Sequence, residues 1–467
     1  MTELHWLDAT ELARRIRARE VSPVEVLRAH RERAQALNPK LNAIVTPIEE
    51  AESEARKAEA AVLRGDELGP LHGVPVTIKD SFDTAGIRTT RGSKLFEHHV
   101  PTADATVVAR LKGAGAVPIG KTNLPEFALW WETGNLVFGR TSNPWNLERT
   151  AGGSSGGEAA AIAAGLSPLG IGSDLGGSIR LPAHYCGVAG LKPTHGRVPL
   201  TGHFPETILR FMHAGPLARS VRDLALALTV LSGPDGRDWH AVPVPPPAVP
   251  EVPDSLAPLR VGWLAERGFG PVDEEVAAIV RRAAEALAGL GAAVEPAEIP
   301  GLEARDCNPL TLALYGAEGR PYLEAVIAGR LDELHPMLQK RFAIPLPSLE
   351  EYVAAEAEVE GLRRDLAEFF RRYDLLLCPT APIAAHRHEL AQVEIAGQTF
   401  PARAAMRATI PFDLTGSPAL SVPFGWSAEG LPIGVQVVGR HFEEETVLRA
   451  GMALEARRGL GELRPPV

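Results

Sequence analysis

Residue types that mark specialised classes of protein are scarce in this sequence. It contains only three cysteines, Cys186, Cys307 and Cys378, and they lie far apart. An odd number of widely spaced cysteines gives neither a disulfide framework nor the paired spacing of a zinc site. Asparagine and glutamine together number twelve, a scarcity typical of heat-adapted proteins. From the cysteine pattern we expect a protein of a reducing compartment. We also expect that it holds neither a metal nor a cofactor.

The sequence also lacks long runs of basic residues and long runs of apolar residues. No basic run occurs, and the net charge is -10, so neither nucleic acid nor an anionic membrane surface is an expected partner. No stretch approaches 18 uncharged apolar residues, and the first twenty residues lack the apolar centre of a secretory signal. These absences predict a cytoplasmic location.

The pattern along the chain predicts an α/β protein. Residues 74–79 and 116–119 are short, apolar and rich in β-branched residues, with a helical stretch at 104–114 between them. After a proline-rich connector at about 242–258, strands and helices alternate again over about 259–467. We expect one large mixed, mostly parallel central sheet covered by helices on both faces, completed by this second segment within a single domain.

Gly115–Thr122 formally matches the phosphate-binding P-loop pattern. The four inner residues of the motif are Ala116–Ile119, which are apolar and read as a strand, and Pro118 removes one backbone donor. Nucleotide binding through this segment is therefore only a remote alternative.

Two glycine-rich loops carry serines in settings suited to catalysis. In Gly153–Gly157, Ser155 and Glu158 also fit a capping box for the helix that follows, which gives Ser155 a structural alternative. In Gly172–Arg180, paired glycines before Ser178 allow several backbone N–H groups to converge on one point, as in an oxyanion hole. Asp174 and Arg180 flank this second loop and are expected to pair across it.

Together these segments resemble the amidase signature family of serine hydrolases. The resemblance lies in a signature core at about 69–197 and spans most of the chain through weaker matches. Its clearest stretches are GPLHGVPVTIKD (69–80), GKTNLPEF (120–127) and GGSSGGEAAAIAAGLSPLGIGSDLGGSIRLPAHYCGVAGLKPT (152–194).

The resemblance implies a Ser–cis-Ser–Lys triad. Ser178 matches the nucleophile, Ser154 the bridging serine that follows a cis peptide bond, and Lys79 the lysine at a strand end. It also implies an oxyanion hole made by the backbone amides of Leu175, Gly176, Gly177 and Ser178. From their places in the two loops, Ser155, Asp174 and Arg180 are expected to support this site.

Lysine acts as a base only when it is neutral. Its pKa must fall from about 10.4 to near 7, and burial at the end of a strand supplies such a decrease. We therefore expect Lys79 to be buried, to lack a carboxylate partner and to contact Ser154, with Asp80 on the opposite face of the strand. The rival mechanism is a Ser-His-Asp triad that uses His184 or His195, both close to Ser178 in sequence.

Within this family the sequence favours a stand-alone amidase that hydrolyses a carboxylic acid amide through an acyl-enzyme on Ser178. The alternative is the glutaminase subunit of a tRNA-dependent amidotransferase. Those subunits carry an acidic anchor where this chain has Ala404–Met406, and a serine where it has Glu158.

Segments outside the signature are expected to set substrate preference. Trp130, Trp131 and Tyr315 are the candidate pocket residues, and the variable segments at about 126–140, 200–212 and 302–346 hold further large side chains. These are Phe138, Phe204, Phe211, Tyr322 and Met337. They favour an aryl or acyl amide as the small-molecule substrate. A homodimer is the oligomer that the resemblance suggests, although no interface is legible in the sequence.

Overall fold

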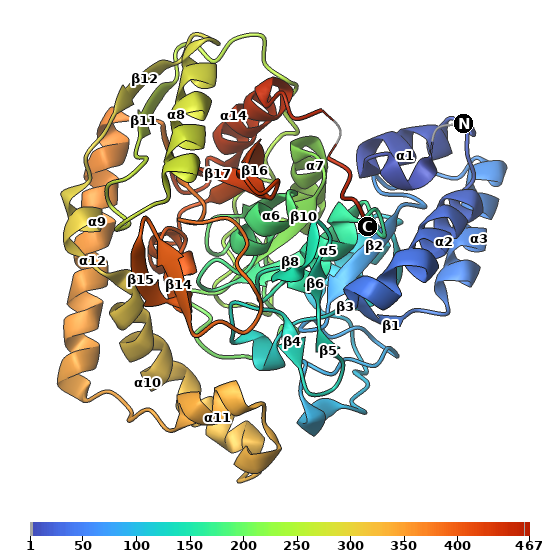
Figure 1. The fold of residues 1–467 in the computed structure, drawn as a ribbon. Coiled ribbons are helices and arrows are strands. Elements are labelled where there is room, and N and C mark those ends of the chain that lie inside the picture. Colours follow the sequence, from blue (N-terminus) through green and yellow to red (C-terminus); the bar gives the residue numbers. More distant parts are fainter. Residues whose placement is uncertain (1–2, 462) are drawn as a thin grey trace.

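One long sheet organises the fold. A computed structural model describes residues 3–461 and 463–467. Within them eleven strands form a single sheet, which crosses the molecule in Figure 1. From edge to edge the strands are β1 Ile44–Pro47, β3 Val117–Thr122, β2 Pro75–Lys79, β8 Leu169–Asp174, β10 His213–Ala218, β9 Ala189–Lys192, β16 Ala419–Trp426, β17 Pro432–Gly439, β13 Leu375–Pro379, β11 Arg260–Trp263 and β12 Ala293–Pro296.

The sheet is mixed, as the sequence predicts. Parallel pairing is concentrated in two runs, β3-β2-β8 and β13-β11-β12, which contain the predicted αβ steps. The strands between these runs pair antiparallel, as do β1 and β3. Residues 242–258 contain no helix or strand. Strands from both sides of this connector therefore share one sheet.

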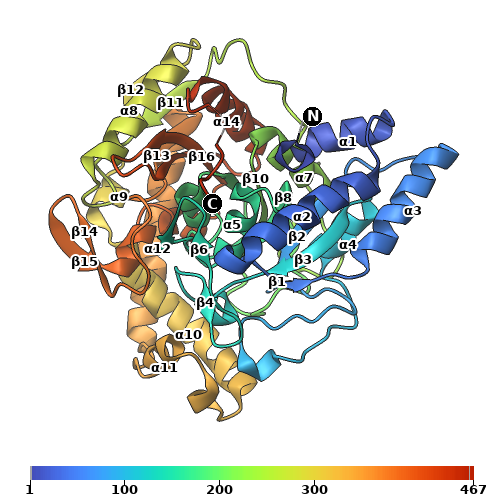
Figure 2. The same cartoon turned by 45° about the vertical axis from the view of Figure 1, so that its right-hand side comes forward.

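Helices cover both faces of the sheet (Figures 1 and 2). Their bounds are α1 Ala9–Arg17, α2 Pro23–Leu41, α3 Ala51–Arg64, α4 Thr106–Gly113, α5 Gly156–Ala163, α6 Arg180–Cys186, α7 Val221–Leu231, α8 Glu274–Ala288, α9 Pro300–Ala304, α10 Cys307–Ile327, α11 Pro336–Phe342, α12 Leu349–Arg372, α13 Ile410–Leu414 and α14 Glu444–Arg457. Three short two-stranded pairs lie outside the sheet: β4 Gly134–Asn135 with β5 Gly139–Arg140, β6 Ser142–Asn143 with β7 Asn146–Thr150, and β14 Gln392–Ile395 with β15 Gln398–Pro401. Among the described helices, none is long and apolar enough to cross a membrane.

Alternation along β13 shows how the two faces are filled. Leu375 and Leu377 pack into the core beneath α7, α8 and α14, whereas Leu376 and Cys378 pack into the core beneath α12. This is the period of two expected for a strand buried on both sides. The described helices α5 and α6 lie beside the middle strands and carry the glycine-rich loops at their N-termini.

The formal P-loop match is a strand. Val117–Thr122 is β3, and Lys121 is fully buried within it. The Lys121 ammonium donates to the Phe82 carbonyl at 2.7 Å and to the Thr89 hydroxyl at 2.9 Å, and it lies 3.3 Å from Asp80. A lysine committed to internal partners cannot cradle a phosphate, so nucleotide binding at Gly115–Thr122 is wrong.

Leu377 tests the importance of the central sheet. It lies on β13, between β11 and β17, and its side chain is completely buried in the core beneath α7, α8 and α14. Leu377→Ala should lower the free energy of unfolding by about 2–5 kcal/mol, because it removes buried methyl groups and leaves a cavity. Val353→Ala, at a helix position that is 56% exposed, is the control and should change it by less than about 0.5 kcal/mol. Urea denaturation of both variants measures the difference, and equal effects would contradict this account of the core.

Candidate active site

Lys79 is the last residue of β2 and is completely buried. Its Nζ lies 2.7 Å from Ser154 Oγ and 3.0 Å from Ser173 Oγ. Among the described residues no carboxylate forms an ion pair with it. The neighbouring Asp80 turns away and accepts hydrogen bonds from the Thr90 backbone and hydroxyl at 2.9 and 2.6 Å. The burial, the serine contact and the unpaired ammonium all agree with the geometry predicted for Lys79.

The electrostatic surroundings of Lys79 favour its neutral form. Burial lowers the pKa of Lys79 to about 7, and the carboxylates of Asp174 and Glu158 oppose this decrease from beyond ion-pair distance. At neutral pH a large share of the amine therefore carries a free lone pair. A hydroxyl 2.7 Å away is well placed to donate to it.

The capping box expected for α5 is absent. Ser155 precedes α5, but its hydroxyl donates to the Ser173 carbonyl at 3.3 Å and makes no cap. Glu158 instead points into the core, where it accepts hydrogen bonds from the hydroxyls of Thr77 and Thr122. The prediction failed because tertiary partners on β2 and β3 outcompete the local backbone. Burial raises the pKa of Glu158 to about 7, while these two hydrogen bonds oppose that rise.

Gly170 on β8 makes room for the Glu158 carboxyl. A Cβ added at Gly170 would lie 1.6 Å from Glu158 Oε1 and 2.8 Å from Thr77 Oγ1. Any side chain at this position would displace the carboxyl from its two threonine donors. The absence of a side chain at Gly170 therefore keeps the space in which the Glu158 carboxyl lies.

Ser154 follows a cis peptide bond from Gly153, as the family resemblance implies. Ser178 lies in the loop between β8 and α6, and the Ser155 amide donates to its carbonyl at 3.1 Å, which joins the two serine loops. No hydrogen bond joins the hydroxyls of Ser154 and Ser178 within the described part of the chain. Catalytic hydrogen bonds are often long without substrate, so the relay between these serines stays a prediction.

The amides expected to form the oxyanion hole differ in availability. Gly177 N–H donates to the Asp174 carboxylate, so it is already occupied. Leu175, Gly176 and Ser178 have no acceptor for their amides among the described residues. Gly177 has a φ of +125° and packs so tightly that an added Cβ would lie 2.2 Å from Thr409 Oγ1. The loop therefore leaves three of the four predicted donors for an oxyanion.

Buried hydrogen bonds from Arg180 hold this loop in place. Its guanidinium donates to the Asp174 carboxylate at 3.0 and 3.1 Å, which confirms the predicted pair across the loop. It also donates to the Thr409 carbonyl, Gln436 and Asp413 at 2.7–2.9 Å. All of these groups are buried. The attraction between Arg180 and Asp174 holds the pKa of Asp174 well below its usual range, despite the opposing effect of burial.

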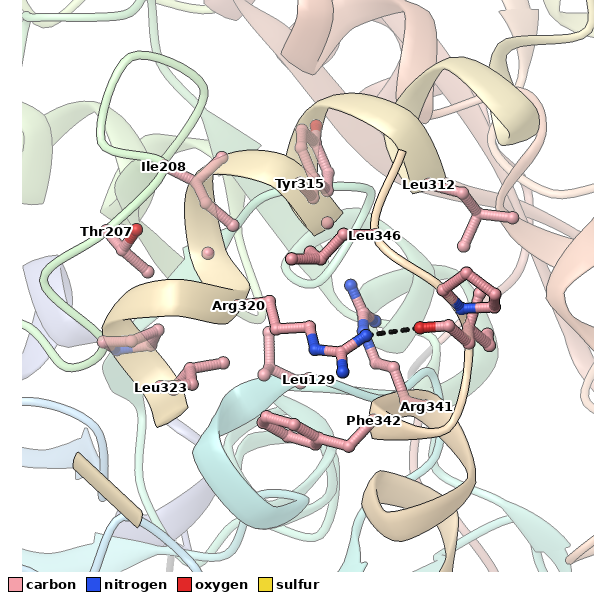
Figure 3. A pocket seen from close by; sticks show the side chains of 15 residues that line it. Leu129, Thr207, Ile208, Leu312, Tyr315, Arg320, Leu323, Arg341, Phe342 and Leu346 are labelled. Atoms are coloured by element: carbon pink, nitrogen blue, oxygen red, sulfur yellow. Dashed lines mark hydrogen bonds between the residues drawn. The ribbon is translucent and has the colours of Figure 1, made fainter. Parts of the chain in front are cut away.

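Ser178 opens onto a cavity of about 330 Å³. The candidate pocket residues Trp130, Trp131 and Tyr315 all line it, and the two indoles stack with centroids 3.7 Å apart. The Tyr315 hydroxyl donates to the Leu175 carbonyl at 2.8 Å and so contacts the loop that carries Ser178. Five of the cavity residues, including Tyr315 and Arg341, also line a narrower adjoining pocket of about 60 Å³ (Figure 3).

Other aromatic residues expected to shape substrate preference lie elsewhere. Phe211 packs into the core beside α12, and Phe204 and Tyr322 pack with Phe127. Phe138 also lies outside the Ser178 cavity, whereas Met337 lines it. Sequence reasoning did not single out Arg341 or Arg403 as cavity residues. No motif in the sequence links these two arginines, because they lie on separate segments that meet only in the folded structure.

The histidines of the rival mechanism make no contact with Ser178 in the described structure. His184 is completely buried, and its two ring nitrogens contact the carbonyls of Gly434 and Ile383 at 3.1 Å. His195 contacts the Leu209 carbonyl at 2.9 Å. Neither ring forms a hydrogen bond with Ser178 in the described residues, so this geometry does not support a Ser-His-Asp triad.

Sequence comparison identifies the family. A family model described as Amidase matches residues 25–448. The chain belongs to the amidase signature family. Among curated relatives, a glutamyl-tRNA(Gln) amidotransferase subunit from Moorella thermoacetica is 39% identical over 492 residues, a match covering 99% of both chains.

Solved structures of amidase signature enzymes share the whole fold. The inhibitor-bound complex that reports the evolutionary origins of an s-triazine catabolic enzyme superposes with a TM-score of 0.90 and 34% identity, covering 97% of this chain and 98% of the other. Substrate-bound 6-aminohexanoate cyclic dimer hydrolase superposes with a TM-score of 0.87 and 33% identity, covering 99% of each. The mixed sheet with its helical layers is thus the amidase signature fold.

The buried guanidinium tests how this amidase signature loop is held. Arg180→Met should lower the free energy of unfolding by about 3–5 kcal/mol, because it leaves Asp174 and Asp413 buried without their cation. Arg371→Met removes the same charge from a side chain that is 76% exposed and should change stability by less than about 0.5 kcal/mol. Denaturation curves at pH 7 compare the two, and a loss below about 1 kcal/mol for Arg180→Met would contradict this role.

Proposed function

We propose that this chain is an amidase that hydrolyses a carboxylic acid amide through an acyl-enzyme on Ser178. One observation carries the proposal. Lys79 is buried, forms no ion pair with a described carboxylate, and contacts Ser154. The cavity beside it is lined by Ser178 and by Leu175 and Gly176, whose backbone amides have no acceptor among the described residues. This arrangement supplies a base, a nucleophile and electrostatic stabilisation in one place.

In the proposed reaction one proton moves from Ser178 to Lys79 and is then returned to the leaving nitrogen. Ser178 Oγ attacks the amide carbon while its proton passes through Ser154 to the neutral amine of Lys79. The oxyanion that forms is stabilised by the free amides of the Leu175–Ser178 loop. The C–N bond then breaks as Lys79 returns the proton through Ser154 to the departing nitrogen. Water, activated by the same relay, attacks the acyl-enzyme and releases the acid.

The glutaminase subunit of a tRNA-dependent amidotransferase is the second candidate. The name of the curated relative supports it, and a protein of that kind would require a partner chain. The described residues that line the Ser178 cavity include several large apolar side chains and no aspartate or glutamate, which favours the amidase, whereas the glutamates that could pair with an ammonium group line the adjoining cavity that shares Trp130 and Trp131. Hydrolysis of glutamine and of a panel of aryl and acyl amides by the isolated chain separates these functions. Glutamine as the only substrate would support the amidotransferase function.

Covalent labelling tests the nucleophile. A fluorophosphonate probe should label the wild-type protein, and Ser178→Ala should abolish labelling and reduce amide turnover by at least about 10³-fold. Ser53→Ala, on the exposed side of α3, is the control and should label normally. Undiminished labelling or turnover in Ser178→Ala would refute the proposed acyl-enzyme.

The pH profile tests the base. Because only neutral Lys79 accepts a proton, kcat/KM should fall about tenfold per pH unit below an apparent pKa near 7 and level off above it. Glu158→Gln removes a carboxylate that raises the pKa of Lys79, so the acid limb should move toward lower pH, by less than about one unit because Glu158 itself has a pKa of about 7 and is partly protonated there. The buried groups titrate as a coupled pair. A shift toward higher pH would contradict this electrostatic role for Glu158.

A further inference from the structure

A second cavity adjoins the one that holds Ser178. It has a volume of about 700 Å³, and four of its lining residues also line the Ser178 cavity: Trp130, Trp131, Met337 and Lys340. Ser178 itself is not among the described residues of its wall. The proposed reaction makes no use of this second cavity, which is large enough to hold a chain of several carbons.

The buried charged residues of the second cavity are acids. Glu126 and Glu132 line it and are only 4% and 9% exposed. The exposed part of the same wall is mixed in charge, because it contains Glu389, Arg140 and Lys340. Neither buried glutamate forms an ion pair with a described lysine or arginine. The interior of the cavity is therefore negative and lacks a matching cation.

Only one of the two buried glutamates has a free oxygen. Glu126 accepts hydrogen bonds on both oxygens, from the Ser93 hydroxyl and from the His335 amide, each at 2.6 Å. Glu132 accepts the Glu389 amide on Oε2 at 3.0 Å. Its Oε1 accepts no hydrogen bond from any described residue. Glu132 is therefore the acid of this wall that can receive a donor from a ligand.

The base nearest to Glu132 does not neutralise it. His388 Nδ1 lies 3.9 Å from Glu132 Oε2, and His388 Nε2 contacts the Leu147 carbonyl at 3.2 Å, so Nε2 is the protonated nitrogen. Burial lowers the pKa of His388, which keeps the ring neutral. Burial also raises the pKa of Glu132 to about 7, while the hydrogen bond from Glu389 opposes this rise. A bound cation would stabilise the ionised carboxylate.

The aromatic wall shared by the two cavities also suits a cation. Trp130 and Trp131 stack with ring centroids 3.7 Å apart, and both line the second cavity. The face of an indole attracts an organic ammonium, and its area covers the carbons attached to that ammonium. Indoles beside an unpaired carboxylate are thus a combination that recognises an alkylammonium group.

The segment that carries Glu132 packs against the loop that carries Ser154. A Cβ added at Gly153 would lie 2.8 Å from the backbone nitrogen of Glu132. Thr133 Oγ1 donates to the Gly152 carbonyl at 2.8 Å. The wall of the second cavity is therefore fixed to the loop of the proposed relay.

This contact indicates which half of the substrate enters the second cavity. In the proposed reaction the leaving nitrogen receives its proton from Ser154, so it must face the Ser154 loop when the C–N bond breaks. The amides available to the oxyanion belong to the Leu175–Ser178 loop, on the side of the Ser178 cavity. The acyl half therefore stays in the Ser178 cavity, and the amine half leads toward Glu132.

We propose that the second cavity binds the amine half of the substrate and selects leaving amines that carry a terminal ammonium, with Glu132 pairing with the ammonium and Trp130 and Trp131 covering the carbons before it. This inference rests on the amidase function proposed above. Hydrolysis breaks the C–N bond, and water supplies the new C–O bond. The products are a carboxylate and a diamine with both nitrogens protonated.

Two matched pairs of compounds test the selection. N-(4-aminobutyl)benzamide and N-pentylbenzamide differ only in an ammonium or a methyl at the end of the amine half. The anilides of 5-aminopentanoic acid and hexanoic acid make the same exchange in the acyl half. At about pH 8, wild-type kcat/KM should be at least about 30-fold higher for the ammonium member of the benzamide pair. The ratio within the anilide pair should be near one or lower.

Variants of the acid locate the ammonium site. Glu132→Gln still accepts the Glu389 amide but loses the charge, so it should reduce the ratio in the benzamide pair at least about tenfold, mainly through KM. Glu132→Asp keeps the charge and should recover part of the ratio. Glu368→Gln removes an equal charge from a side chain of α12 that is 68% exposed, and it should keep the wild-type ratio. Inhibition of N-pentylbenzamide hydrolysis by pentylammonium is a second readout and should weaken in parallel.

The outcomes separate this inference from the proposed function. Ser178-dependent hydrolysis with a ratio near one in the benzamide pair would overturn the ammonium site and leave the amidase standing. A preference for ammonium confined to the anilide pair, or a high benzamide ratio that Glu132→Gln leaves intact, would also overturn it. If no amide is hydrolysed, binding of pentylammonium by calorimetry decides, and equal affinity in wild type and Glu132→Gln would refute the site.

Discussion

The position of Ser178, the proposed nucleophile, depends on one buried guanidinium. Arg180 begins α6 directly after the serine loop, and its donors reach the loop through Asp174 and the C-terminal half of the chain through Thr409, Asp413 and Gln436. Burying three charged groups is unfavourable unless each is matched. The network therefore requires both halves of the sheet to be in place before the Leu175–Ser178 loop has a defined shape.

A second constraint is the desolvation of Lys79. The pKa of this lysine falls because β2 is buried on both sides, and not because another cation sits beside it. Glu158 lies in the same core, satisfied by Thr77 and Thr122, and limits how far that pKa falls. Fold stability and the reactivity of the proposed base are thus set by the same buried layer.

Much of the fold and the centre of the site could be predicted from the sequence. Periodicity located the strands and helices, and the signature motifs placed Lys79 beside Ser154 and Asp174 beside Arg180, because each motif sits at the junction of two elements. The capping role of Ser155 was wrong because Glu158 finds partners on distant strands. The hydrogen bond from Gly177 N–H to Asp174 could not be predicted either, since it depends on the path of the loop.

The cavity walls were the least predictable part. Trp130, Trp131 and Tyr315 could be proposed from residue type, but Phe204 and Phe211 had the same character and lie in the core. Arg341 and Arg403 come from α11 and a turn after β15 (Gln398–Pro401), which meet only in three dimensions. Their convergence follows from tertiary packing, for which a single sequence carries no local signal.

This division of the chain bears on how such an enzyme can change over time. The proposed reacting groups lie on segments anchored in the central sheet, whereas much of the cavity wall comes from α10, α11 and the segment at 401–406. Amino-acid substitutions in those peripheral segments would alter which substrates the cavity admits without displacing Lys79, Ser154 and Ser178. The architecture thus lends itself to diversification by exchange of its outer segments, and recombining them between relatives is a rational route to new selectivities.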